Sequence, residues 1–520
     1  MPRDRNPQPF GASFALQGQP AEIGLIVDEL IDELINDGFD AGEPQHGRSP
    51  LRAIRLERGT DEWLVVTVAL PRTDRLVRPA EYDVIVCGLV RGRDELHERV
   101  SRLPFTPLEL KIIAQEMPLT ASATERMNYW LPDLETSRPL AGHGAIFTIH
   151  HQTDFVLMLE KAIELGIETE LVTVIDKEYR YRNSRRVDAY LRRRLGVPVY
   201  TFSEIKRGIS DHIRRVEKAR QDGGQLGWAP TIVVDDGGYI LPRLIESFGP
   251  FLSFFKGVVE QTTSGIWALQ PFRHDLPVPI FSVAESELKA TVEAHGVAQA
   301  GLTNLRQILP QEKFEGRRAI VVGYGTIGQA LADLLRRQNV DVHVHDSSAP
   351  KLVSARERGL QVGGDLPELI ESVQPRYVFA CAGPGAVGAE ALTRIRADCA
   401  LVSLTSRDTA FDKTALGEMG GAERVGTIGT VYRRSDPLCS LILVADGYPI
   451  NFHFAESMPN QQSDLVMASL LVGAVTLASA QPEWPAGNDP TRANAVLAES
   501  TLLNDFLKAE PPLLAEGRPE

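Results

Sequence analysis

Short apolar runs separated by amphipathic stretches organise the chain from about residue 107 onward. Residues 144–149, 231–234 and 319–322 are predominantly apolar, and such runs are typical of strands buried on both faces of a sheet. The stretch 155–165, which follows the first run, places apolar residues at helical spacing. Strands that alternate with helices predict parallel sheets with helices on both faces. We therefore predict an α/β fold with two doubly wound, parallel-sheet domains.

Residues 1–105 show a different pattern. The stretch 23–35 has apolar residues at helical spacing, whereas 63–69 and 82–88 have strand-like patterns. Residues 1–20 are rich in Pro, Gly and Gln, which predicts a mobile N-terminus. We predict a small α/β appendage that carries no catalytic motif. Its role as a docking or oligomerisation element stays open.

Composition and charge exclude several classes of protein. The chain has 520 residues, too many for one core, so several domains are expected. The 69 acidic and 55 basic residues give a net charge of −14, which argues against nucleic acid as a partner because phosphate binding needs a basic surface. The 4 cysteines form no C-x-x-C, so we predict neither a metal site nor a disulfide framework. The sequence shows no signal peptide and no membrane-spanning run, and a cytoplasmic protein without a membrane partner is expected.

A glycine motif supplies the first candidate chemistry. The apolar run 319–322 leads into Gly323, Gly325 and Gly328, and a further predicted strand ends at Asp346. In this order the glycines permit a tight turn, the approach of a pyrophosphate and helix packing, while the acid accepts a ribose 2′-OH. The pattern predicts a Rossmann-like domain that binds NAD rather than NADP. The alternative is an α/β crossover with chance glycines.

Polar residues at other predicted strand ends give further candidates. His150 follows the run 144–149, and Asp236 follows 231–234. Ligands of parallel sheets bind at the carboxyl ends of the strands, which favours a functional role for both. The alternatives are a helix N-cap for the His-rich turn and a turn acid for Asp236. Residues 257–270 contain hydroxyls and amides around Gly265, as a polar binding loop would.

Ordered motifs from residue 107 to 480 resemble those of the S-adenosylhomocysteine hydrolase family. The matching segments are 116–118 (EMP), 149–150 (IH), 234–238 (VDDGG), 260–265 (EQTTSG), 278–293, 323–328 (GYGTIG) and 445–451 (ADGYPIN). The resemblance implies a substrate and catalytic domain, an NAD-binding domain and a tail. The predicted bounds are 106–295 plus 456–485 for the first, 296–455 for the second and 486–520 for the third.

The resemblance also implies a reaction. Members of the family use tightly held NAD⁺ to oxidise a ribose 3′-OH, eliminate the 5′ substituent after loss of the C4′ proton, add water and reduce the ketone again. By position, Lys289 would help to deprotonate the 3′-OH, and Glu293 would hold a sugar hydroxyl. Asp236 and His150 would be the acid/base groups near C4′ and C5′. The implied substrate-binding residues are Gln152, Asp154, Gln261 and Met458; the implied cofactor-binding residues are Thr262, Thr263, Gly323, Gly325, Thr326, Ile327, Gly328, Asp346 and Asn451.

The chain departs from the family pattern at several substrate positions. Gln261 replaces a ribose-binding Glu, residues 404–407 (LTSR) replace N-I-G-H, and 457–459 (SMP) replace G-H-P. These changes favour a different leaving group or sugar. We therefore favour a nucleoside dehydratase, a lyase of the kind found in angustmycin-type nucleoside-antibiotic biosynthesis.

Two alternatives remain open. One is a divergent adenosylhomocysteinase that hydrolyses S-adenosylhomocysteine. The other is a non-catalytic NAD-binding regulator that uses residues 1–105 as a partner module. The resemblance implies a homo-oligomer, either a dimer or a tetramer.

Overall fold

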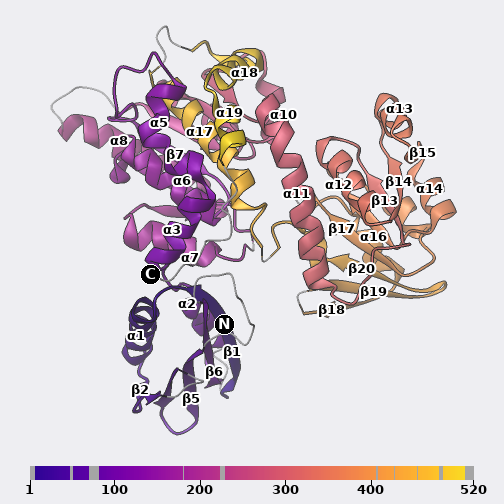
Figure 1. Ribbon diagram of the computed structural model, residues 1–520, viewed down its shortest axis with the longest axis horizontal. Helices are drawn as coiled ribbons and strands as arrows, with labels where there is room; N and C mark the ends of the chain where they lie inside the picture. Colours follow the sequence, from indigo (N-terminus) through magenta and orange to yellow (C-terminus); the bar gives the residue numbers. More distant parts are fainter. Residues whose placement is uncertain are drawn as a thin grey trace. The chain divides into compact units, whose positions relative to one another are not determined.

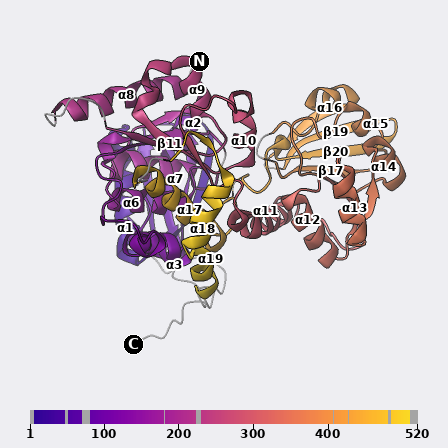
Figure 2. The ribbon, with the colours of Figure 1, turned by 90° about the horizontal axis from the view of Figure 1, so that it is seen from above.

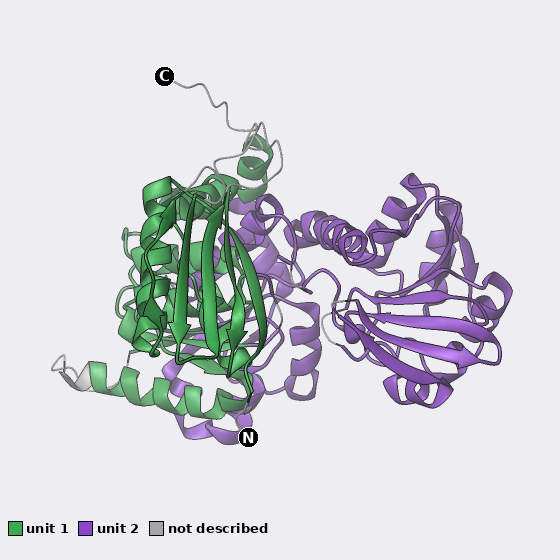
Figure 3. Cartoon of the chain, turned by 90° about the horizontal axis from the view of Figure 1, so that it is seen from below, with its two compact units in different colours: residues 1–176, 183–232, 501–520 green, residues 177–182, 233–500 purple. Residues whose placement is uncertain are grey.

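The computed structural model of the chain forms two compact units. The structure describes residues 6–46, 51–69, 81–179, 181–222, 229–405, 408–426, 428–453, 455–479 and 484–509. The first unit comprises residues 1–176, 183–232 and 501–520, and the second comprises 177–182 and 233–500 (Figure 3). The domain bounds inferred from the sequence stay a prediction.

The N-terminal part of the first unit is an antiparallel sheet with helix α1 (Pro20–Asn36) on one face (Figure 1). Its strands have the order β1-β6-β5-β4-β2, with β3 beside β4. Their bounds are β1 (Gln8–Gln17), β2 (Asp40–Ala41), β3 (Gln45–His46), β4 (Arg52–Arg58), β5 (Glu62–Ala69) and β6 (Glu81–Val90). The predicted helix and strands are confirmed, but the expectation of a mobile N-terminus is wrong for β1. Phe10 and Leu16 of β1 join the core, and this burial fixes the strand.

The second sheet has the strand order β21-β12-β11-β10-β7-β8-β9. The bounds are β7 (Gly144–Thr148), β8 (Val172–Asp176), β9 (Val199–Thr201), β10 (Thr231–Asp235), β11 (Phe255–Glu260), β12 (Pro279–Ser282) and β21 (Gly487–Asn488). Within the first unit, β7, β8 and β9 pair in parallel, and α8 (Ile205–Asp222) packs on them. Within the second unit, β11, β12 and β21 pair in parallel, and α17 (Asn460–Ser479) packs on β11 and β12.

Within its described residues, the first unit contains seven further α-helices. They are α2 (Arg93–Val100), α3 (Pro107–Glu116), α4 (Pro118–Ala121), α5 (Ala123–Trp130), α6 (Thr153–Glu164), α7 (Ser184–Ala189) and α19 (Leu502–Lys508). The second unit also contains α9 (Ile240–Ser247), α10 (Thr263–Leu269), α11 (Glu287–Ile308) and α18 (Pro490–Glu499). The expected loop at 257–270 is instead the end of β11 followed by α10.

The third sheet has the order β15-β14-β13-β16-β17-β20-β19-β18, parallel from β15 to β20. The bounds are β13 (Arg318–Val322), β14 (Asp341–His345), β15 (Gln361–Gly363), β16 (Tyr377–Ala380), β17 (Cys399–Ser403), β18 (Gly421–Val425), β19 (Gly429–Ser435) and β20 (Leu438–Val444). From β15 to β20 the order is that of a doubly wound dinucleotide-binding sheet. The predicted fold class is therefore confirmed.

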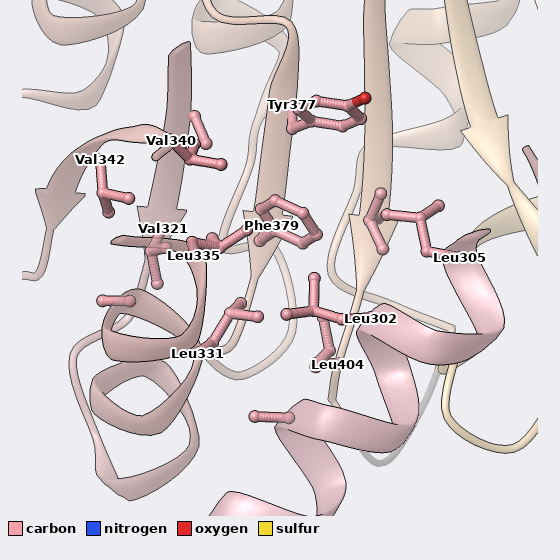
Figure 4. Packing of buried hydrophobic residues seen from close by; sticks show 14 of the residues in the cluster. Leu302, Leu305, Val321, Leu331, Leu335, Val340, Val342, Tyr377, Phe379 and Leu404 are labelled. Atoms are coloured by element: carbon pink, nitrogen blue, oxygen red, sulfur yellow. The ribbon is translucent and has the colours of Figure 1, made fainter. Parts of the chain in front are cut away.

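Alternate residues of each central strand build two separate cores. Val321 and Phe379 face α11 and α12 (Thr326–Arg337) (Figure 4), and α12 lies beside α11 (Figures 1 and 2). Ile320 and Val378 face the opposite way. The helices on that second side are α14 (Leu366–Val373), α15 (Ala389–Thr393) and α16 (Lys413–Met419). This period of two leaves the central strands β13, β16 and β17 buried on both faces.

Helix α17 is long and apolar enough to cross a membrane by length and composition alone, but 78% of its apolar window is buried within the protein. A helix that is apolar on all sides is expected in the core of a large protein. We therefore assign α17 to the core of the second unit, where it packs on β11, β12 and α11.

Candidate active site

The glycine turn between β13 and α12 has a different requirement at each glycine. Gly323 has φ +98, and a Cβ there would lie 2.8 Å from the Ala382 side chain. Around Gly325 no atom lies within 4 Å of a Cβ position, so the backbone is open to a ligand. A Cβ on Gly328 would lie 1.9 Å from the Gly323 carbonyl oxygen. The turn thus has the geometry that a pyrophosphate at the N-terminus of α12 requires.

The predicted pyrophosphate site includes the first turn of α12. Thr326 is exposed and Ile327 is half-buried, and the N–H groups of a first helical turn have no partner within the helix. Both predicted residues therefore lie where a phosphate group would accept hydrogen bonds from the backbone.

Asp346 follows β14 and faces the same turn. Its carboxylate accepts hydrogen bonds from the N–H of Tyr324 (2.7 Å) and of Ser348 (2.8 Å). Burial pushes the pKa of Asp346 upward, but these N–H groups and the Lys351 ammonium outweigh it and hold the pKa below its ordinary value. The fixed negative charge suits a ribose hydroxyl and disfavours a 2′-phosphate, so the residues present fit NAD.

Buried acids lie at the end of the second sheet. Glu260, the last residue of β11, is fully buried and accepts hydrogen bonds from the N–H groups of Gly237, Gly238 and Thr262. Burial, together with the nearby Asp235, raises the pKa of Glu260 well above its ordinary value. Burial likewise raises the pKa of Asp235 to about 7. The tertiary fold thus brings the D-D-G-G and E-Q-T-T segments into one hydrogen-bonded cluster.

Asp236 pairs with Lys177, a residue that the sequence analysis missed. The Lys177 Nζ lies 2.9 Å from Asp236 Oδ1 and 2.8 Å from the Asp236 carbonyl oxygen. The side chains are only 5% and 3% exposed. The available signal was the position of Lys177, which directly follows the apolar strand β8.

Lys289 and Glu293 form an ion pair on α11, with Lys289 buried and Glu293 half-buried. The Lys289 ammonium donates a hydrogen bond to the Gln261 carbonyl oxygen and lies 3.1 Å from Glu293 Oε2. The spacing of four residues places the pair on one helix face. Ser286 caps the helix by accepting the Lys289 N–H. The structure therefore brings together three residues that the sequence predicted, namely Lys289, Glu293 and Gln261.

The same face of α11 continues toward Met458. A Cβ on Gly296 would lie 2.2 Å from Gln462 Oε1 and 3.4 Å from Met458 Cβ, so both side chains pack against this glycine. Asn451 donates from Nδ2 to the Ser457 carbonyl oxygen at 3.4 Å. Met458 and Asn451 thus share the second unit with Lys289, and Gln462 is a further polar neighbour that the motifs did not identify.

The predicted residues of the first unit follow β7. His150 is half-buried, whereas Gln152 is 2% exposed and Asp154 is 4% exposed. Gln152 occupies the N-cap position of α6 without a side-chain cap bond, and Asp154 accepts the Phe155 N–H at 2.7 Å. His151 is fully buried, with its Nδ1 3.7 Å from Asp176 Oδ2. Gln152 and Asp154, which the sequence predicts to bind substrate, are therefore both buried just after the end of β7.

Thr262 is part of the scaffold rather than an open ligand. Its hydroxyl donates to Glu260 Oε1 at 2.9 Å and accepts the Gly265 N–H at 3.1 Å, which caps α10. Thr263 is exposed. The cofactor roles predicted for both residues stay predictions.

Several buried polar atoms have no hydrogen-bond partner among the described residues. They include Thr148 Oγ1, both ring nitrogens of His151 and Gln152 Nε2 in the first unit, and Gln261 Oε1, Asn451 Oδ1 and Gln462 Oε1 in the second. Leaving such groups unpaired costs about 1–3 kcal/mol each, so the unpaired atoms that follow β7 and those that follow β11 each favour a polar ligand nearby. Among the described residues, no group of three His, Cys, Asp or Glu side chains could hold a metal ion. Residues Ser406 and Arg407, at the position of the family's catalytic loop, lie outside the described residues.

No family model matches the chain. The adenosylhomocysteinase of Acinetobacter baylyi is 23% identical over 399 residues, which are 73% of this chain and 81% of that protein. The S-inosyl-L-homocysteine hydrolase of Methanopyrus kandleri is 24% identical over 378 residues, 71% of this chain and 83% of that protein.

These relatives support a divergent member of the adenosylhomocysteinase family. The dipicolinate synthase of Bacillus subtilis is similar in structure, with a TM-score of 0.37 and 10% identity over 65% of this chain and 98% of that chain. The relatives support the resemblance found in the sequence, and the glycine turn with Asp346 fits NAD as the cofactor. The comparisons thus support an NAD-dependent enzyme similar to adenosylhomocysteinases.

Proposed function

We propose that this enzyme catalyses an NAD-dependent, redox-neutral elimination on a nucleoside, and that it is a nucleoside dehydratase of secondary metabolism. The observation that carries the proposal is the buried Lys289, paired with the half-buried Glu293 beside Gln261, in the same unit as the NAD site. Burying a charged lysine costs folding free energy, and a buried charge paired in this way favours a catalytic role.

The Lys289–Glu293 pair would take the proton of the sugar 3′-OH. When bound, NAD⁺ accepts the hydride from C3′ and later returns it. The Asp236 carboxylate would then remove the C4′ proton, which the 3′-ketone has made acidic. The electron pair of the C4′–H bond forms the C4′=C5′ bond, and the 5′ substituent leaves with its own bonding pair. In this proposal His150 protonates the leaving oxygen, so the net change is the loss of one water.

The departure at Gln261 supports elimination over hydrolysis. Gln261 supplies a neutral amide where the resemblance implies a ribose-binding carboxylate, and its Oε1 has no hydrogen-bond partner among the described residues. A neutral amide binds a sugar hydroxyl without adding a charge to the site, which already holds the carboxylate of Glu293. A changed sugar contact is what a different leaving group would require.

Hydrolysis of S-adenosylhomocysteine or a related thioether is the second candidate, because the relatives are named for such reactions. It would use the same first steps and then add water at C5′. One incubation with NAD⁺ distinguishes the two. A nucleoside that loses 18 Da by mass (the mass of water) supports the dehydratase, whereas release of free thiol from S-adenosylhomocysteine supports the hydrolase.

Absence of both products, with no NADH formed on any nucleoside, would refute catalysis and favour a non-catalytic NAD-binding regulator. The dimer or tetramer that the resemblance implies stays a prediction, which the mass measured by light scattering would test.

A further inference from the structure

Lys177 is buried at a point where the chain crosses into the second unit. It follows β8 directly, and its side chain is only 5% exposed. Its Nζ donates hydrogen bonds to the carbonyl oxygen and to Oδ1 of Asp236, at 2.8 Å and 2.9 Å. The same Nζ lies 5.6 Å from the ring centres of Tyr179 and Tyr239. The cation is thus flanked by aromatic rings and directed at the Asp236 carboxylate.

Two further buried acids, Asp235 and Glu260, lie close to Asp236 at this strand end. Burial raises the pKa of Asp235 to about 7, and burial with the nearby Asp235 raises the pKa of Glu260 well above its ordinary value. Neighbouring buried acids cannot all ionise without a compensating cation. Lys177 supplies that cation, and its contacts select Asp236.

An aromatic cluster holds the short segment that carries Lys177. Tyr179 packs on Tyr448 and Phe452, with ring centres 6.4 Å and 6.1 Å apart. Tyr181 packs edge-on against Phe452 at 5.5 Å. These rings fix the segment to the turn that contains Asn451, in the same unit. Packing against Tyr448 and Phe452, which follow β20, therefore supports the position of Lys177 beside Asp236.

We infer that Lys177 is a positioning residue for proton abstraction: its ammonium holds the Asp236 carboxylate by two hydrogen bonds to this residue and orients it as the base. The inference rests on the proposed function and adds a residue to it. It separates two steps, because hydride transfer uses Lys289 and Glu293, whereas removal of the C4′ proton uses Asp236 and its partner Lys177.

The test measures both steps on the full-length enzyme loaded with NAD⁺ in D₂O, with adenosine as the probe. Hydride transfer is read as NADH absorbance, and proton abstraction as deuterium at C4′ by mass spectrometry and NMR. For Lys177→Met we expect NADH formation within about 3-fold of wild type and C4′ exchange reduced by about 100-fold or more. Lys177→Arg, which keeps the cation, is expected to recover exchange to within about 10-fold.

The matched control is Lys161→Met, which removes a lysine paired with Glu164 on α6 and should change neither step. If Lys177→Met does not fold by its thermal transition, Lys177→Gln replaces it, because the amide keeps a donor without the charge. Wild-type exchange in the Lys177 variants, or an equal loss of NADH and exchange, overturns the inference. Wild-type enzyme that forms no NADH on adenosine or on any other nucleoside refutes the proposed function instead.

Discussion

Two regions of the second unit differ in how their polar groups are satisfied. We call the glycine turn with Asp346 the cofactor half, and the proposed site around Lys177, Asp236, Lys289 and Gln261 the substrate half. At the end of the third sheet, the Asp346 carboxylate accepts backbone hydrogen bonds from Tyr324 and Ser348 without a ligand. At the end of the second sheet, the buried Lys177–Asp236 pair and the buried Lys289 with its partner Glu293 lie near amide oxygens that have no partner among the described residues.

This difference reflects what each half has to do. A dinucleotide is bound by backbone geometry, which also suits the folded state, so the cofactor half is locally stable. The substrate half must hold charges and unpaired acceptors in a buried place, and both cost folding free energy. Such groups persist where a ligand or a reaction uses them. The contrast therefore predicts that substitutions in the cofactor half reduce NAD⁺ affinity and stability. Substitutions in the substrate half are predicted to reduce turnover.

The largest effect is expected for Gly328→Ala. Its Cβ would overlap the Gly323 carbonyl oxygen at 1.9 Å, so α12 would have to move from β13. We expect the free energy of unfolding to fall by about 3 kcal/mol and NAD⁺ affinity to fall by more than about 100-fold. Denaturant unfolding and NAD⁺ titration measure these. Gly417→Ala is the control, since a Cβ there meets no atom within 4 Å; equal behaviour of the two variants would contradict the assignment of the turn.

Lys289→Met is expected to act on turnover alone. Its ammonium contacts Gln261 and Glu293, both in the substrate half. We expect NADH formation on a nucleoside to fall by about 10²- to 10⁴-fold, with NAD⁺ affinity unchanged. Stopped-flow absorbance and NAD⁺ titration separate the two. Lys218→Met, at an exposed position of α8, serves as the control, and an equal loss of NAD⁺ affinity in Lys289→Met would remove the distinction between the halves.

The same contrast explains what could be predicted from the sequence. The cofactor half lies within one continuous stretch, so the spacing of Gly323, Gly328 and Asp346 was enough to identify it. The Lys177–Asp236 pair joins residues from different strands, and no local spacing links them. Sequence patterns also missed most of α11, which begins at Glu287, because Gly296 and Gly301 interrupt its apolar face.

An intermediate effect is expected for Asp346→Asn. The substitution removes the charge beside the predicted ribose site but keeps an acceptor for the Tyr324 N–H. We expect the ratio of NAD⁺ to NADP⁺ affinity to fall by about 10- to 100-fold, the worth of a hydrogen bond to a charged group. Isothermal titration with both cofactors measures it. Asp341→Asn, at the exposed start of β14, is the control, and an unchanged ratio in Asp346→Asn would argue against the ribose contact.

The smallest effect concerns His212, which lies at the amino ends of strands of the second sheet and not at their functional ends. Its ring nitrogens lie 2.8 Å and 2.9 Å from the Thr173 and Thr231 hydroxyls, so the neutral ring is fully satisfied. Burial, with a contribution from Arg215, lowers the pKa of His212 from 6.5 to about 3. As the pH falls below 6.5 the unfolded chain takes up the proton first, so stability is lost from there down to the folded value.

The loss should reach about 1.4 kcal/mol per pH unit. His212→Gln removes this titration, and the free energy of unfolding of the variant should therefore decline less steeply between about pH 6 and pH 4, while NADH formation at neutral pH is unchanged. Denaturant unfolding at several pH values measures the slope, and His274→Gln, at an exposed position, is the control. A parallel decline in wild type and His212→Gln would show that His212 is protonated in the folded protein. If His212→Gln lost NADH formation, the amino ends of these strands would also contribute to activity. The functional residues would then not be confined to the carboxyl ends.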